Sequence, residues 1–270
     1  MAAHETLAAL FTDIANAIRA KGGTTGQIVA DAFPEAIAAM PAIGLKQYAE
    51  QGWTDANLSS TEITKVRDYA FAGNESVVTA NFTGVTDVGT SAFQGCTKLT
   101  TFDFSTVKSI GSYAFNGCSA LGPDVSLPNC TRLWDRAFTN CASLVSFSAP
   151  KVTVIYHSTI SGCESLTTVS LPLVTTLNDW CLSANPVLKE LTLPSVTKMT
   201  RYALARGGLE KLVLPGTTLC TIAGDTFQST PIEKGTGYVY VPDDMVDSYK
   251  AADSWKNIAD QIKPMSELPE

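Results

Sequence analysis

Apolar residues recur along the middle of the chain in a pattern that repeats every 22 or 23 residues. Each copy ends in an anchor pair, most often a small side chain followed by a large one, and these pairs fall at residues 70–71, 92–93, 114–115, 137–138, 159–160, 181–182, 203–204 and 226–227. A fixed period of this length predicts a solenoid, in which each repeat buries its apolar face only against its neighbours. The pattern therefore indicates one elongated body and not two globular domains.

Residues 166–188 show what one copy predicts. The alternating residues 169–171 are typical of a short strand with one face inward. Proline then ends the strand, and the corresponding prolines stand at 128, 150, 172, 194, 215 and 242. Val174 and Leu177 also point inward, before a compact bend leads to the anchor pair. Stacked strands predict a parallel sheet along one side, with short helical turns or irregular bends opposite, and the crossover rule makes the solenoid right-handed.

Residues 107–118 read Val-Lys-Ser-Ile-Gly-Ser-Tyr-Ala-Phe-Asn-Gly-Cys. This segment resembles the BspA-like, or treponemal, class of bacterial leucine-rich repeats, whose pattern is L-x-x-[LVI]-x-[LVI]-P-x-x-[VL]-x-x-I-G-x-x-A-F-x-x-C. The resemblance covers residues 63–242 and implies about eight turns of a leucine-rich-repeat solenoid. The second half departs from the pattern, because it lacks the Gly at 134, 156, 178 and 200 and the Cys at 185 and 207. We expect those turns to bend differently.

Two short amphipathic helices are predicted ahead of the repeats. Residues 5–20 place apolar side chains on one helix face, and a second helix is expected from Asp31 to Met40. A pair this short must dock on the first solenoid turns or on another protein. Residues 14–37 are similar to a short N-terminal module of phage and prophage proteins of Gram-positive bacteria, often tail or baseplate components. This resemblance implies attachment to a virion or another larger assembly through residues 1–44.

The chain therefore divides into four predicted parts. An attachment module at 1–44 precedes a linker or N-terminal cap at 45–62, the solenoid at 63–242 and a helical C-terminal cap at 243–270. Solenoids need such caps to protect the open edge of the sheet. The expected fold class is an α/β repeat: a right-handed leucine-rich-repeat solenoid with one parallel β-sheet, a short helical N-terminal module and a helical C-terminal cap.

The cysteines follow the repeat. Cys96, Cys118, Cys141 and Cys163 each stand three residues after an anchor pair, a position that predicts small buried side chains. Because free Cys packs as a small hydrophobe, we expect a reduced ladder in the core and not a disulfide framework. The chain has no C-x-x-C pair with a nearby His, so no zinc site is predicted. Neither a metal nor a cofactor is expected.

Charge and motifs narrow the functional classes. The net charge of -7 disfavours binding to a phosphate backbone, so nucleic acid is not an expected partner. No apolar run reaches the ~18 residues of a membrane span, which predicts no membrane insertion. The two histidines, His4 and His157, have no expected shared site, and the sequence contains no serine-hydrolase, zinc-protease or phosphate-loop motif. The interpretation is a protein that is not an enzyme.

Two groups of side chains are candidates for binding. The first is the outward face of the predicted sheet, whose two ladders are Thr79, Thr101, Asp124, Ser146, Thr168, Glu190 and Lys211, then Asn81, Asp103, Ser126, Ser148, Ser170, Thr192 and Val213. Hydroxyl-rich ladders suit hydrogen bonding to a glycan or a flat protein surface, and they equally suit plain solvation. The second is Trp134 with Tyr156 and His157, since the two aromatics share one repeat position and neighbouring aromatics are frequent binding anchors. Alternatively, the two rings fill a gap left by the altered bend.

These observations lead to a functional hypothesis with two alternatives. The first is a non-enzymatic recognition protein, a phage or prophage tail-associated component that binds a protein or glycan on a bacterial surface. The runner-up is a bacterial adhesin that binds host or neighbouring cells, the role usually proposed for BspA-like proteins, and the third is a structural spacer. The N-terminus lacks a secretory signal, so we expect synthesis in the cytoplasm and a final location in a virion tail, or outside the cell after lysis.

Overall fold

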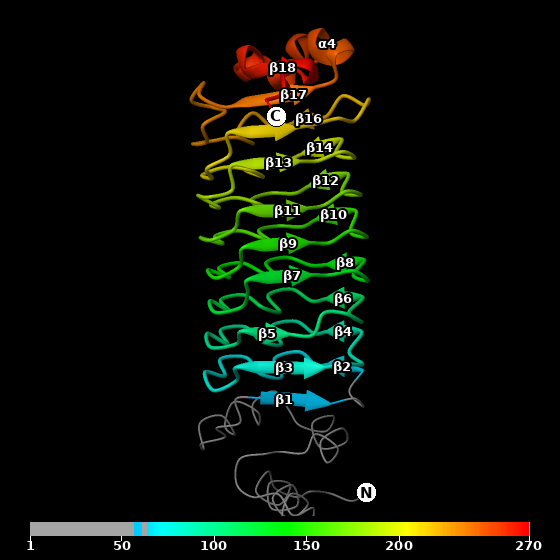
Figure 1. Ribbon diagram of the computed structural model, residues 1–270, viewed down its shortest axis with the longest axis vertical. Helices are drawn as coiled ribbons and strands as arrows, with labels where there is room; N and C mark the ends of the chain where they lie inside the picture. Colours follow the sequence, from blue (N-terminus) through cyan, green and yellow to red (C-terminus); the bar gives the residue numbers. More distant parts are fainter. Residues whose placement is uncertain (1–56, 61–63, 270) are drawn as a thin grey trace, which may run out of the picture.

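Two rows of short parallel strands run along a column of stacked turns (Figure 1). The computed structural model describes residues 57–60 and 64–269. The predicted attachment module, with both of its helices, and most of the linker at 45–62 lie outside these residues. The described chain confirms the expected solenoid of parallel strands.

The first row faces the viewer in Figure 1 and comprises the longer strands. These are β1 (Asn57–Ser60), β3 (Thr79–Phe82), β5 (Thr101–Phe102), β7 (Asp124–Ser126), β9 (Ser146–Ser148), β11 (Thr168–Ser170), β13 (Glu190–Thr192), β15 (Lys211–Val213) and β17 (Tyr238–Val241). Paired neighbours are one repeat apart, as in Ser146 opposite Thr168 and Glu190 opposite Lys211. This row holds the parallel strands that the alternating pattern predicts along one side. They pair in three consecutive groups, β1-β3-β5, β7-β9-β11 and β13-β15-β17.

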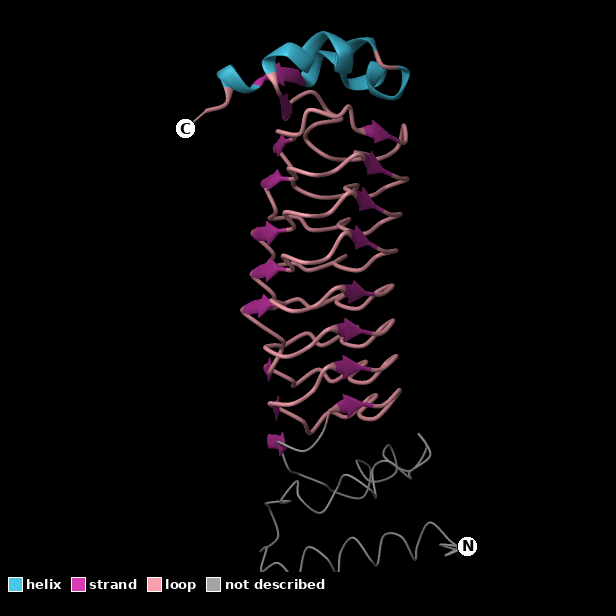
Figure 2. Ribbon diagram, turned by 90° about the vertical axis from the view of Figure 1, so that its right-hand side faces the viewer, coloured by secondary structure: helices cyan, strands magenta, loops and turns pink. Residues whose placement is uncertain are grey.

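The second row was not predicted as strands. It comprises β2 (Lys65–Val66), β4 (Asp87–Val88), β6 (Ser109–Ile110), β8 (Arg132–Leu133), β10 (Val154–Ile155), β12 (Thr176–Leu177), β14 (Lys198–Met199) and β16 (Thr221–Ile222). Figure 2 shows the two rows as separate columns of arrows. The sequence showed only that residues such as Leu177 point inward. Their backbones also pair with the turns before and after, so each turn has a strand in both rows.

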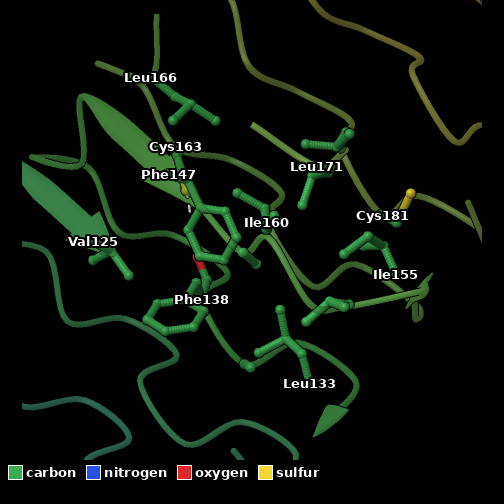
Figure 3. Close-up of a cluster of buried hydrophobic side chains, with 14 of the residues drawn as sticks. Val125, Leu133, Phe138, Phe147, Ile155, Ile160, Cys163, Leu166, Leu171 and Cys181 are labelled. Atoms are coloured by element: carbon green, nitrogen blue, oxygen red, sulfur yellow. Dashed lines mark hydrogen bonds between the residues drawn. The ribbon is translucent and has the colours of Figure 1, made fainter. Parts of the chain in front are cut away.

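The core is a continuous stack of anchor side chains. The rings of Phe93 and Phe138 lie on either side of Phe115, at centroid distances of 5.4 and 5.2 Å and nearly parallel. Phe147 of β9 meets Phe138 edge-on at 5.3 Å, and Ile160 continues the stack in the next turn (Figure 3). All of these side chains are buried. Because each ring contacts the turns on both sides, the core joins neighbouring turns directly.

Threonine hydroxyls add a second link between turns. The hydroxyl of Thr175 donates to the carbonyl of Thr153, and those of Thr197 and Thr221 donate in the same way to Thr175 and Thr197, at 3.2 to 3.3 Å. Thr175 and Thr197 directly precede β12 and β14, and Thr221 is the first residue of β16. Part of the threonine content therefore holds the column together.

The bend that carries each anchor pair uses left-handed backbone at two positions. In one turn these are Tyr113, with φ 60°, and Gly117, with φ 73°. The second position is Gly in four of the described turns, at 73, 95, 117 and 162, and Asn140, Ala184, Arg206 or Ser229 in the others. Glycine adopts this conformation without steric cost, which explains the Gly two residues after the anchor Phe in the first turns.

The C-terminal segment covers the last turn, as the sequence predicted, and adds one strand. It comprises η2 (Asp243–Met245), α4 (Val246–Ala251), η3 (Asp253–Gln261), β18 (Ile262–Pro264) and η4 (Met265–Glu267), and β18 pairs in parallel with β17 (Figure 2). The indole N–H of Trp255 donates to the carbonyl of Cys220 at 2.7 Å, and the Cys220 N–H donates to the Tyr249 hydroxyl at 3.0 Å. Both aromatic side chains are buried. None of the helices in residues 64–269 has the length and apolar character to cross a bilayer.

Candidate binding site

Aromatic side chains gather where each second-row strand gives way to the anchor bend. Tyr113, Trp134, Tyr156, Trp180 and Tyr202 occupy this corner in five consecutive turns, and we call them the aromatic corner. Trp134 and Tyr156 stand three residues before the anchor pair, and the other three stand one residue before it. The corner therefore presents one aromatic ring per turn along part of the column.

The rings of the aromatic corner form two stacked pairs. Trp134 and Tyr156 have centroids 5.2 Å apart and an interplanar angle of 28°, and Trp180 and Tyr202 are 4.1 Å apart at 22°. Trp134 is 41% exposed although it is a large apolar side chain. The prediction that Trp134 and Tyr156 lie side by side is confirmed. Tyr156, Trp180 and Tyr202 are half-buried. Stacked aromatics that reach the surface offer large rigid contact areas at low entropic cost.

Two rings of the aromatic corner, Trp180 and Tyr202, stand at backbone positions where large side chains are unusual. Trp180 and Tyr202 adopt φ of 60° and 58°, a region that bulky residues seldom occupy. Asn or Gly would fit the same bend with less strain. Strained backbone positions that keep large side chains are often found at functional sites.

Arginines lie against three of the corner rings. Arg136 lies over Tyr113 at 5.5 Å, Arg201 over Tyr202 at 5.3 Å and Arg206 over Trp180 at 4.9 Å, measured from the guanidinium carbon to the ring centroid. Such contacts are cation–π interactions. Arg201 also bonds the carboxylate of Asp225 at 3.2 Å, and this hydrogen bond is the main reason why its pKa is raised.

A hollow of about 240 Å³ adjoins Trp134. Two glycines explain why it exists. Gly89 and Gly111 hold the repeat position that Trp134 and Tyr156 fill in the next turns. A Cβ on Gly111 would lie 2.7 Å from the carbonyl carbon of Gly89 and 2.6 Å from the Thr90 nitrogen, so these turns approach too closely for a side chain. The surface is therefore bare at the two glycines, and Trp134 forms a wall beside them.

Polar side chains complete the lining of the hollow. One oxygen of Asp68 accepts the Thr90 N–H at 2.8 Å. Asp87, Ser109 and Ser112 also line the hollow. Asp87 accepts from the Thr86 hydroxyl at 2.7 Å and lies 3.9 Å from the guanidinium of Arg132. The two carboxylates are thus held in place by the protein. Together with the serines they supply hydrogen-bonding groups beside an aromatic plane.

The predicted ladders of the sheet are present, but they lie apart from the hollow. The register places Thr79 beside Thr101, and it aligns two rows of outward residues, Asp124, Ser146 and Thr168, and Ser126, Ser148 and Ser170. Asp103 follows β5 and is half-buried, and Thr192 of β13 is exposed. Glu190 and Lys211, neighbours in one predicted ladder, form an ion pair with a 2.8 Å contact. None of these side chains lines the hollow.

His157 is half-buried beside the corner. Its backbone N–H donates to the Asp135 carboxylate at 3.1 Å, and its carbonyl accepts the Arg136 N–H at 2.9 Å. Both of these hydrogen bonds use backbone atoms of His157 and not its imidazole ring. Within residues 64–269 there is also no group of three or more His, Cys, Asp or Glu placed to hold a metal ion.

Sequence reasoning missed the residues that shape the hollow. Asp68, Asp87, Gly89 and Gly111 were not among the candidates, although all four line it. The signal was available in the change from Gly to Trp at one repeat position. Its meaning depends on how closely the turns approach, which the repeat alone does not reveal.

Comparison with protein families connects these features to known repeats. Residues 42–161 and 123–233 match the model of the BspA type leucine rich repeat region, in six copies. The chain belongs to this family. No curated protein matches the sequence.

Solved structures of leucine-rich repeat proteins are similar to this chain. A leucine rich cell surface protein from Faecalibacterium prausnitzii is 19% identical with a TM-score of 0.48, over 66% of this chain and 69% of that chain. A leucine-rich repeat protein from Bacteroides ovatus is 20% identical with a TM-score of 0.47, over 77% of this chain and 69% of that chain. The leucine rich repeat protein of T. pallidum is 24% identical with a TM-score of 0.35, over 43% and 69%.

Proposed function

We propose that this BspA-type repeat protein is a non-enzymatic recognition protein that binds a target on a cell surface through its aromatic corner. The observation that carries the proposal is the two stacked pairs, Trp134 with Tyr156 and Trp180 with Tyr202. Trp134 is exposed and the other three rings are half-buried, so each pair is open to solvent in part. Aromatic residues and Arg are the side chains most enriched where binding energy concentrates. Here both types meet along one edge of the column.

The chemistry of the described residues favours binding over catalysis. The cysteines are buried, and burial raises the pKa of Cys96 and Cys163 to about 12. Thiols with such values are protonated near neutral pH, whereas a catalytic Cys acts as a thiolate. The carboxylates of Asp68 and Asp87 lie in an open hollow, without the enclosure that prepares a general acid or base.

Cell binding by the full chain tests this proposal. The variant that combines Trp134→Ala and Tyr156→Ala removes one stacked pair and is expected to bind weakly, because each ring is a candidate hot spot of about 2 kcal/mol. A matched control combines Thr168→Ala and Thr192→Ala, two exposed residues of the sheet ladders. Flow cytometry with fluorescently labelled protein measures both on a panel of bacterial cells. Normal binding by the aromatic variant, with loss in the control, would move the site to the sheet face.

Where the protein operates is a finer proposal. We propose that residues 1–44 attach it to a phage or prophage tail, on the strength of the similarity of residues 14–37 to modules of tail and baseplate proteins. The protein would then be synthesised in the cytoplasm and released with the virion on lysis. Membership of the BspA-type family supports the alternative, a bacterial adhesin that binds host or neighbouring cells. In both cases the partner is a protein or glycan of a cell surface.

Truncation separates attachment from recognition. A fragment of residues 45–270 retains every described turn and the C-terminal cap, so it should still bind target cells. It should be missing from purified virions of a strain that carries it in place of the full chain. Recovery of the full chain on intact cells that release no virions would favour the adhesin. Absence of cell binding by the full chain itself would favour the structural spacer.

A further inference from the structure

Trp134 has two differently occupied sides. Tyr156 of the following turn stacks on it at 5.2 Å, while the hollow over Gly89 and Gly111 lies toward the two preceding turns. The indole of Trp134 is therefore packed on one side by Tyr156 and borders the open hollow on the other. Support from Tyr156 holds the ring in place, so little side-chain entropy remains to be lost when a ligand binds.

We propose that this hollow binds one unit of a neutral saccharide, with a sugar ring packed against Trp134. This inference rests on the proposed function, because it names the ligand class of one part of the aromatic corner. A sugar ring has a C–H face that packs on an aromatic plane and an edge of hydroxyls that need hydrogen-bonding partners. The hollow supplies both within one small space.

The polar partners are placed and oriented by the fold. Asp68 is fixed through one oxygen by the Thr90 N–H at 2.8 Å, and within the described residues its other oxygen has no hydrogen bond. Asp87 is held by the Thr86 hydroxyl and by Arg132. Carboxylates accept hydrogen bonds from hydroxyl groups, and charge-assisted bonds are the stronger ones. The hydroxyls of Ser109 and Ser112, which also line the hollow, can donate or accept.

The balance of charge favours a neutral ligand over an ion. Two carboxylates, Asp68 and Asp87, line the hollow together with Lys65, which is the register partner of Asp87 on the neighbouring strand. Arg132 lies on the same row and contacts Asp87. Opposite charges are therefore matched around the hollow. A cation would have to compete with Lys65 and Arg132 for the carboxylates, and an anion would be repelled by Asp68 and Asp87.

The size of the hollow sets the expected affinity. A volume of about 240 Å³, open to solvent, accommodates a single ring and not an extended chain. One ring with a few hydrogen bonds corresponds to a Kd of about 1 mM. Useful avidity would then come from several units on one surface, which suits a polymer of repeated sugars on a cell.

Saturation-transfer NMR on the full chain tests the ligand class. The probes are lactose, maltotriose and triacetylchitotriose, each at about 10 mM, ten times the expected Kd, and choline chloride is the cationic comparison. At least one saccharide should receive saturation from the protein and shift the indole N–H resonance of Trp134. Trp134→Ala should abolish the transfer, and Asp87→Asn should weaken binding several-fold. Trp180→Ala and Asp124→Asn are the matched controls, because they remove a corner ring and a carboxylate outside the hollow, and they should bind normally.

Each outcome decides the proposal. Absence of transfer to all three saccharides overturns it, as does transfer that persists in Trp134→Ala or transfer to choline alone. If saccharides bind but the double variant at Trp134 and Tyr156 still binds cells, this proposal stands and the proposed function fails. If cell binding needs Trp134 but no saccharide binds, the proposed function stands and the hollow recognises another chemistry.

Discussion

The thiol of Cys118 donates a hydrogen bond to the backbone carbonyl of Phe93, 3.1 Å away in the preceding turn. The same relationship links Cys96 to Phe71, Cys141 to Phe115 and Cys163 to Phe138, at 3.0 to 3.3 Å. The position thus needs a small apolar side chain that can donate a weak hydrogen bond, and Cys meets both conditions. Where Cys is replaced by Asn185, the amide donates to the carbonyls of Ile160 and Leu182 instead. The cysteine ladder is therefore structural.

Reagent access provides the first prediction. Cys96, Cys118, Cys141 and Cys163 are buried and unpaired, so a thiol reagent should modify them slowly in the native protein and completely after denaturation. Mass spectrometry after timed alkylation measures the extent at each site. Fast native modification would place the thiols at the surface, and mass evidence for pairs among the four would contradict the reduced ladder.

Alkaline pH should destabilise the fold through the same thiols. Burial raises the pKa of Cys96 to about 12 from an ordinary value of 9.0, and it raises the pKa of Cys163 to the same value. Above pH 9 the unfolded chain releases thiol protons that the folded chain keeps, so the free energy of unfolding falls as the pH rises. This contribution is complete below pH 9 and is lost between pH 9 and about 12.

Urea unfolding at several pH values between 8 and 10.5 measures the slope. Each thiol contributes at most about 1.4 kcal/mol per pH unit. The variant with Cys96→Ser and Cys163→Ser should be less stable at pH 8 and should show a shallower loss toward alkaline pH. An unchanged slope in that variant would assign the alkaline loss to other groups, such as Tyr249, whose pKa burial also raises.

The regularity of the repeat decides how much the sequence could predict. A side chain at one repeat position meets the same surroundings in each turn, so the burial of Cys118 and Phe115 and the alignment of Glu190 with Lys211 followed from the period alone. The second row of strands was missed because each has only two residues, too few for an alternating pattern. The hollow beside Trp134 was missed because it depends on the distance between turns at Gly89 and Gly111.

Removing one core ring should damage the column locally. Phe115 is fully buried between Phe93 and Phe138, and Phe115→Ala should lower the free energy of unfolding by about 3–5 kcal/mol through the cavity it leaves. Hydrogen exchange should accelerate first in the turns around residues 93 and 138, because each turn packs on its neighbours. Phe71→Ala is the matched control, with a smaller expected loss since Phe71 is only half-buried. Unchanged exchange in the neighbouring turns would show that the ring does not couple them.

Gly111 should tolerate no side chain, although its backbone conformation is ordinary. A Cβ there would lie 2.6 Å from the Thr90 nitrogen and 2.7 Å from the Gly89 carbonyl carbon, and backbone atoms cannot move aside as a flexible side chain can. Gly111→Ala should therefore separate two turns and lower the free energy of unfolding by about 1–3 kcal/mol, the usual cost of overpacking. Gly224→Ala is the control, because a Cβ at Gly224 meets nothing within 4 Å, and its effect should stay within about 0.5 kcal/mol. Urea unfolding of both variants measures the difference. Equal stabilities would mean that the first turns are not in close contact at this corner, and the bare surface beside Trp134 would then need another cause.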